Sequence, residues 1–313
     1  MKMSKDDEQL QVLQKKAHFK FMLVLCISIS IFILLMAFFQ WCINEEQEKN
    51  LYEGLLGSVL ASFTFSAGSL CIMYYLIFFP AYQKFNHMFK HKYVLNTIEK
   101  QGFLQCVSYF PYGGFTYADI FKWGVVDCGD EAYFKSEDML CGVYKGIRFQ
   151  FCDITTKRYV QSGRFKNLET VFKGQVMRFD RFDHMKISDG HLQIFQKDFF
   201  SSLRGWTAEY KIETENALFN DQFEVYANNE HNAFYILTPL FMEKIKEFSD
   251  IIDEQVAVTF YETEMMVAIG RIKSMFDANI TDPVLKQKQV ILDDVKQLQN
   301  AGDILLYRTS QYE

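Results

Sequence analysis

Two long apolar runs near the N-terminus constrain this chain more than any other feature. The first extends from Phe19 to Ile43 with no charge after Lys20, and the second, from Leu55 to Phe79, carries no charge at all. A helix rises 1.5 Å per residue, so about 20 such residues cross the roughly 30 Å hydrocarbon layer of a bilayer. Buried core helices of this length usually keep a polar stripe, and signal peptides have a shorter apolar core. The sequence therefore predicts a hairpin of two transmembrane helices.

The charges around the two runs predict their orientation. Lysines lie before the first run and after the second, at Lys15, Lys16, Lys20, Lys84, Lys90 and Lys92. The linking segment, residues 44–53, holds four glutamates and one lysine. In membrane proteins the cytoplasmic loops carry an excess of Lys and Arg. Both ends of this chain are therefore expected in the cytoplasm, with the chain in the cell membrane. If the source is bacterial, that membrane is the inner membrane.

This topology divides the chain into six expected segments. They are a cytoplasmic tail (1–18), a first transmembrane helix (19–43), an external loop (44–53), a second transmembrane helix (54–79), an amphipathic juxtamembrane helix (80–101) and a cytoplasmic domain (102–313). The juxtamembrane helix either continues the second span as a stalk or lies on the lipid headgroups.

Small residues recur every four positions in the second run, at Gly54, Ser58, Ser62 and Ser66. That spacing places them on one helical face, where small side chains allow another helix to approach closely. The short loop makes the first span the favoured neighbour, and oligomerisation between copies is the alternative.

The remainder of the chain shows strand and helix patterns. Strands are expected at 132–141, 147–154, 171–179, 191–195, 255–261 and 265–269. Helices are expected to start at Pro239 and after Pro283, because proline is favoured in a first helical turn, and a further helix is expected near His231. Grouped strands with packed helices predict an α+β domain whose strands are antiparallel, preceded by the transmembrane hairpin.

Short motifs in this domain are similar to a known family. They include Ser136-Glu137-Asp138, Phe172-Lys173-Gly174 and Phe223-Glu224-Val225-Tyr226-Ala227. Over roughly Phe85 to Ile280 the chain resembles an uncharacterised bacterial membrane family, catalogued as domain of unknown function 3137. The resemblance implies a helical hairpin before a cytoplasmic domain, with LemA-like membrane proteins as companions, and implies no activity.

A search for chemistry leaves one weak candidate site. Asp180, Asp183 and His184 cluster in the segment FDRFDH, and His191 follows. Such groups are common metal ligands, but their spacing matches no known motif, and a charged turn between strands explains them at lower cost than a metal site. The seven cysteines show no C-x-x-C spacing, and the net charge of -6 argues against nucleic acid as a partner. We expect no catalytic residues, no metal and no cofactor.

Two hypotheses about function remain open at this point. The first is a membrane-anchored interaction or regulatory module that acts with another membrane protein and with the lipid bilayer. The alternative is a membrane-anchored enzyme with a site near Asp180–His191. A transporter is disfavoured because neither span carries an intramembrane charge. The sequence names neither a small-molecule ligand nor the oligomeric state.

Overall fold

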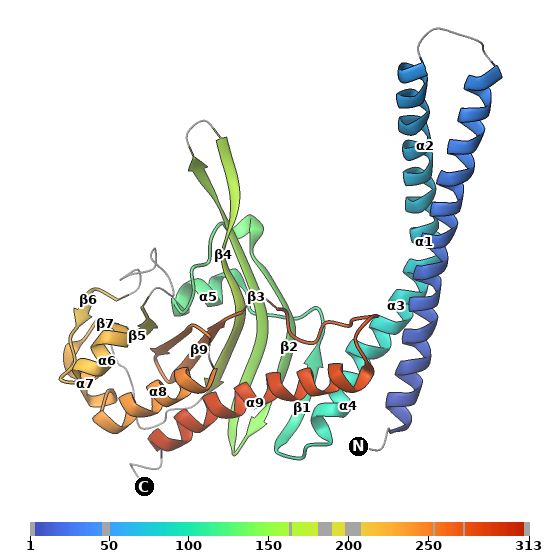
Figure 1. Ribbon diagram of the computed structural model, residues 1–313. Helices are drawn as coiled ribbons and strands as arrows, with labels where there is room; N and C mark the ends of the chain where they lie inside the picture. The colour runs from blue at the N-terminus through green and yellow to red at the C-terminus, as the bar shows by residue number, and fades with distance from the viewer. Residues whose placement is uncertain are drawn as a thin grey trace. The chain divides into compact units, whose positions relative to one another are not determined.

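The computed structural model divides the chain into two compact units (Figure 1). The first contains Met1–Tyr93 and Ala278–Gln287, and the second contains Val94–Asp277 and Lys288–Glu313. The described residues are 4–45, 51–162, 165–180, 190–197, 208–252, 254–271 and 273–309.

The first unit is built from long helices. They are α1 (Lys5–Glu45), α2 (Leu51–Met73), a π-helical segment η1 (Tyr74–Phe78), α3 (Phe79–Met88) and a second π-helical segment η2 (Phe89–Tyr93). Two helical stretches, Lys5–Trp41 and Leu56–Glu99, are long and apolar enough to cross a membrane. In their most apolar windows only 11% and 17% of the residues are buried. The apolar side chains therefore point outward, as expected of surfaces that face lipid.

The second long helix continues past Pro80 without a break. Proline lacks an N–H group, and its ring clashes with the carbonyl four residues earlier. The π-helical segment Tyr74–Phe78 immediately precedes this position, and the N–H of Phe79 donates to the carbonyl of Tyr74 five residues before it. The wider π turn accommodates the proline, so the helix continues through α3.

Polar contacts hold the N-terminal part of α1 in place within the first unit. The Tyr93 hydroxyl donates to Asp7 Oδ1 at 2.8 Å, and both side chains are buried. The Gln14 side chain donates to the carbonyl of Asn279 at 2.9 Å and to that of Asp282. The segment 278–287 thus packs on α1 although it lies more than 260 residues further along the chain.

The predicted packing residues of the second helix face inward where their side chains are described. Ser58, Ser62 and Ser66 are buried, and the Ser28 hydroxyl donates to the Ser66 carbonyl at 3.3 Å. The burial of Gly54 is not among the described features. Close approach of α1 and α2 at this stripe agrees with the small size of serine.

The second unit contains one nine-stranded antiparallel sheet in the order β1-β2-β3-β4-β9-β8-β5-β7-β6. The strands are β1 (Leu104–Phe110), β2 (Lys135–Tyr144), β3 (Ile147–Ser162), β4 (Phe165–Asp180), β5 (His191–Gln196), β6 (Tyr210–Ile212), β7 (Phe223–Ala227), β8 (Val256–Tyr261) and β9 (Glu264–Gly270). The predicted antiparallel strands with packed helices are confirmed.

Helices cover both faces of this sheet. The helical segments after η2 are α4 (Val94–Glu99), α5 (Tyr117–Trp123), a 3₁₀ turn η3 (Glu131–Tyr133), α6 (Ala217–Gln222), α7 (Glu230–Ile236), α8 (Pro239–Ile252) and α9 (Val284–Thr309). One face packs on α5, where Ile120 and Trp123 join a buried cluster with Val176 and Met266. On the other face, Phe241 of α8 contacts the Phe260 ring at 5.9 Å between ring centres. Helix α9 crosses the same face (Figure 1), its Gly302 against the ring of Tyr144.

Candidate functional site

The sequence-predicted cluster is not brought together where the structure describes it. Asp180 and His191 lie in one row across four neighbouring strands, paired in the order Asp180, Glu264, Tyr261, His191. Three strand spacings separate the two ends of the row by roughly 14 Å. Asp183 and His184 lie outside the described residues. Among the described residues, no group of three or more His, Cys, Asp or Glu is placed to hold a metal ion.

Asp180 belongs to a network of ion pairs. Its carboxylate lies 3.1 Å from Arg148 Nε and 3.1 Å from Arg178 Nη2. Arg178 also pairs with Glu264, donates to Gln150 Oε1 at 2.7 Å, and lies over the Trp123 ring at 5.7 Å. Arginine uses its planar fork in this way to join several acceptors. These contacts give Asp180 a structural role at the edge of the α5 face.

His191 connects β5 to the end of helix α5. Gly124 ends this helix in the left-handed conformation, with φ of 58°, which leaves the last helical carbonyls without intrahelical partners. His191 Nε2 lies 2.7 Å from the Lys122 carbonyl, and Gln193 Nε2 donates to the Gly124 carbonyl at 2.7 Å. Because a carbonyl only accepts, His191 carries its proton on Nε2. Burial lowers the pKa of His191, which favours this neutral form.

The buried cysteines do not have the properties of nucleophiles. Burial raises the pKa of Cys128 to about 12 and that of Cys152 to about 12, although Arg158 lies near enough to Cys128 to lower its pKa slightly. A reactive cysteine needs a depressed pKa, because the thiolate is the attacking species. Both thiols belong to the apolar cluster under α5.

The second unit has an open groove that sequence reasoning did not identify. We call it the α6–α8 groove, formed by α6, α7, α8 and the turn before α6. Its two connected hollows measure about 870 Å³ and 630 Å³ and share Asn216, Leu218, Pro239 and Met242. Those volumes lie in the range of sites that hold ligands or peptide side chains.

Two helix caps set the walls of this groove. Asn216 Oδ1 accepts from the Phe219 N–H at 3.1 Å and begins α6, and the Thr238 hydroxyl accepts from the Phe241 N–H at 3.3 Å and begins α8. The Thr214 hydroxyl donates to Asn220 Oδ1 at 2.7 Å, which holds the turn before α6. These caps fix the first turns of both helices, and the groove lies beside them.

Large apolar side chains remain exposed around the groove. Leu218 is 67% exposed, Ile251 56%, Phe234 42% and Leu240 41%. Single exposed apolar residues are ordinary, but several around one concave surface indicate a binding surface. Leu240 and Ile251 are eleven residues apart, three turns of one helix, and both lie beside the buried stripe of Phe241, Ile245, Phe248 and Ile252. That spacing is a sequence signal from which this surface could have been predicted.

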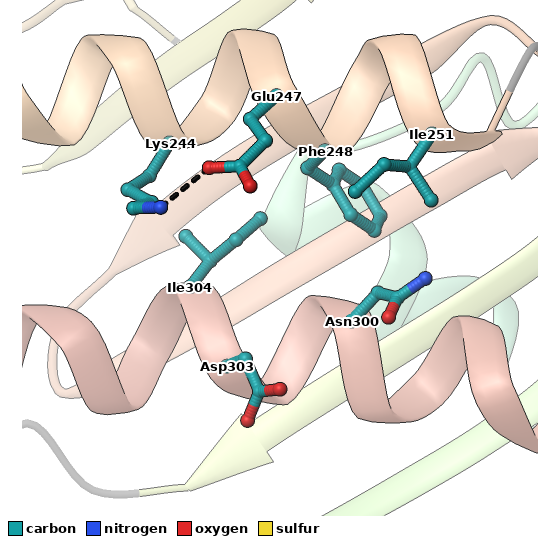
Figure 2. A pocket seen from close by; sticks show the side chains of 7 residues that line it. All are labelled: Lys244, Glu247, Phe248, Ile251, Asn300, Asp303 and Ile304. Atoms are coloured by element: carbon teal, nitrogen blue, oxygen red, sulfur yellow. Dashed lines mark hydrogen bonds and ion pairs between the residues drawn. The ribbon is translucent and has the colours of Figure 1, made fainter.

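A smaller hollow of about 360 Å³ lies on the other flank of α8, between α8 and α9 (Figure 2). Lys244 and Glu247 form an ion pair at its edge, and Ile304 of α9 lies across from them. Asp303 accepts from the Tyr144 hydroxyl at 3.0 Å and pairs with Lys145 at 3.2 Å. The Asp303 carboxylate is therefore engaged with Tyr144 of β2, and Lys244 and Glu247 with each other, so the larger α6–α8 groove is the better candidate for binding.

The fold and the groove define a protein with a hairpin of two apolar helices and an antiparallel sheet domain that carries an open surface groove. Residues 170–306 match the family described as "Protein of unknown function (DUF3137)". The resemblance predicted from the sequence is thereby confirmed for the segment from β4 to α9. The match begins after Ser136–Asp138, so the earlier part of the predicted extent lies outside it. The matched segment contains the whole α6–α8 groove.

Other comparisons add little. No curated protein sequence matches the chain. The comparison with solved structures finds the crystal structure of the mycobacterial trehalose monomycolate transport factor A, TtfA. The alignment covers 68% of this chain and 92% of the TtfA chain. The identity is 11% and the TM-score is 0.37.

Proposed function

We propose that this protein is a membrane-anchored interaction module. In this proposal α1 and α2 cross the membrane as a hairpin, and the sheet unit lies in the cytoplasm and binds another membrane protein through the α6–α8 groove. The observation that carries the proposal is the outward-facing apolar surface of both long helices. Such a surface is stable in lipid and costly in water.

The charges around the hairpin support the cytoplasmic placement of the sheet unit. Lys84 and Lys92 are exposed below the second apolar run, and Lys92 pairs with Asp6 at 3.6 Å. Lys90 is buried, so it adds to the charge bias without reaching the headgroups. An anchored domain also gains effective concentration toward partners in the same membrane, which favours a binding role for the groove.

Photocrosslinking in native membranes tests the binding role. A photoreactive amino acid at Leu218, on the exposed rim of the groove, is expected to yield discrete adducts with a membrane protein. The same group at Tyr112, which is 82% exposed and outside the groove, serves as the control and is expected to yield none of these adducts. Equal adducts from both positions, or none from Leu218, would contradict the use of this groove.

The alternative is an enzyme with a site near Asp180–His191. The ion pairs of Asp180 and the carbonyl contact of His191 favour structural roles for both residues. Alanine substitution of Asp180, Asp183, His184 and His191 tests it in cells. Bound metal that is lost on substituting His184 or His191, together with loss of activity, would replace the proposed binding function with catalysis.

A further inference from the structure

The α6–α8 groove combines its exposed apolar side chains with an acidic rim. Four carboxylates line the two hollows, from Glu215, Glu243, Glu247 and Asp250, together with the ammonium of Lys246. Glu247 also pairs with Lys244, so Glu215, Glu243 and Asp250 carry most of the acidic character. Glu215, Glu243 and Asp250 are exposed, so they are open to an incoming partner. Surfaces of complementary charge steer such partners and select against wrong ones.

Helix stability does not explain the position of the last of these acids. Helix α8 ends at Ile252, and Asp250 lies in its final turn. The helix dipole favours cations there and disfavours carboxylates. The last turn of α8 contains no basic residue. Asp250 is exposed in this turn, so its carboxylate adds to the acidic rim of the groove.

We propose that the α6–α8 groove binds a cationic amphipathic helix, the cytoplasmic juxtamembrane segment of another membrane protein. This inference rests on the proposed function and names its partner by chemistry. The apolar face of such a helix covers Leu218, Leu240 and Ile251, and its lysines and arginines meet the rim carboxylates. Cytoplasmic segments beside membrane spans are rich in Lys and Arg, so this partner chemistry is common at that location.

Two other occupants fit the rim less well. The inner leaflet carries anionic lipids, which the rim carboxylates repel. A second copy of the chain placed on a two-fold axis would bring one acidic rim against another. Both remain outcomes of the experiment below.

The test uses the full chain in phosphatidylcholine nanodiscs and a fluorescent synthetic peptide of about 15 residues, four helical turns, with leucines on one face and lysines elsewhere. Empty nanodiscs provide the blank. We expect saturable binding that weakens as salt is added, because 0.1 M salt screens the attraction between charges that lie more than about 10 Å apart. A matched peptide with glutamate in place of lysine is expected to bind at least about tenfold more weakly. Equal binding of both peptides would overturn the proposal.

Variants assign the binding to the groove. The double variant Leu218→Ser with Leu240→Ser removes exposed apolar contacts. The double variant Glu243→Lys with Asp250→Lys reverses the charge of the rim. Each double variant is expected to weaken peptide binding about tenfold or more. Matched controls make similar changes at exposed positions outside the groove. Tyr112→Ser is the control for the loss of apolar contacts, and Glu131→Lys with Glu169→Lys is the control for the charge reversal. Unchanged affinity in the groove variants would overturn the proposal.

Two parallel measurements cover the other occupants. Cosedimentation of the nanodiscs with phosphatidylserine vesicles that depends on the groove residues would assign the groove to lipid and overturn the proposal. Concentration-dependent self-association that depends on them would assign it to a second copy and overturn it likewise. Both nanodisc faces are open to the peptide, so an incorrect topology would contradict the proposed function and leave this binding result intact.

Discussion

Burial changes the chemistry of Asp153 on β3 strongly. The side chain is 6% exposed, and its Oδ2 accepts the Met275 N–H. Its Oδ1 has no hydrogen-bond partner among the described residues. Burial raises the pKa of Asp153 to about 8, despite the Met275 contact that lowers it, and neighbouring Asp138 and Asp294 raise it further. Asp153 is therefore largely protonated in the folded protein near neutral pH.

A pH dependence of stability follows from Asp153. The folded state holds this proton up to pH of about 8, whereas an unfolded carboxyl releases it near 3.8. The folded state thus binds more protons in this window, so the free energy of unfolding falls as pH rises through it and levels off above it. Asp153→Asn mimics the protonated form and is expected to flatten the fall, with a gain of about 1 kcal/mol or more at pH 8.

Thermal unfolding of the full chain in detergent at pH 5 and pH 8 measures this effect. Asp221→Asn, an exposed change on α6, is the control and should unfold with the wild-type dependence. A slope that Asp153→Asn leaves unchanged would show that Asp153 is ionised in the folded protein.

The residue scale also shows where sequence reasoning about the site stops. The segment FDRFDH drew attention because acids and histidines cluster in sequence, but Asp180 and His191 become separated across four strands. Their partners, Arg148 and the Lys122 carbonyl, come from other elements. No local spacing rule predicts such pairings.

At the scale of elements, helix α9 approaches the sheet closely at Gly302. A Cβ at this position would lie 2.6 Å from the Tyr144 ring. We expect Gly302→Val to destabilise the second unit by about 1–3 kcal/mol, because the added atoms overpack this contact. Lys296→Val, at an exposed position of the same helix, controls for a valine in α9 that makes no contact with Tyr144. Denaturant unfolding of both variants measures the difference, and equal midpoints would show that α9 tolerates a side chain there.

A second element prediction concerns the segment 278–287 on α1. Gln14→Ala removes the donor to the carbonyls of Asn279 and Asp282, each hydrogen bond being worth about 0.5–1.5 kcal/mol. Gln287 donates to the same two carbonyls, so the loss is expected at the lower end of that range. Hydrogen exchange of the Asn279 and Thr281 amides should accelerate in Gln14→Ala and remain unchanged in Gln9→Ala, an exposed position. Unchanged exchange in Gln14→Ala would mean that the segment does not depend on α1.

Element predictions succeeded where local patterns were strong. Strands β8 and β9 are nearly continuous apolar runs on either side of a short turn, and helix α8 begins with Pro239. Helix α5 was missed because seven residues give too little periodicity, although its capping box, Thr116 and Asp119, is a usable signal. Pairing of β4 with β9 joins Gly174 to Gly270, and no local pattern reports a contact of that sequence distance.

The α6–α8 groove as a whole could not be predicted from local sequence patterns either. Its walls come from three short helices between Thr214 and Ile251, and only the exposed residues of α8 carried a periodic signal. Helix caps could be predicted one by one, but the space between capped helices depends on how they pack on the sheet.

At the scale of the whole molecule, the chain divides into a helical unit and a sheet unit. A chain that begins at Lys92 keeps the entire second unit and loses α1. We expect it to be soluble and to unfold cooperatively, because roughly 210–220 residues are enough to bury a core. Its Asn279 and Thr281 amides should exchange faster than in the full chain. Aggregation of this fragment under all conditions would show that the helical hairpin is part of the fold of the sheet unit.

The most direct test of the central claim is the topology of the chain in its membrane. Reporters are fused after Glu313 and, separately, inserted in the loop of residues 44–53. Green fluorescent protein reports the cytoplasm, and alkaline phosphatase is active only outside it. The account predicts fluorescence from the C-terminal fusion and phosphatase activity from the loop insertion. Phosphatase activity from the fusion after Glu313 would contradict it.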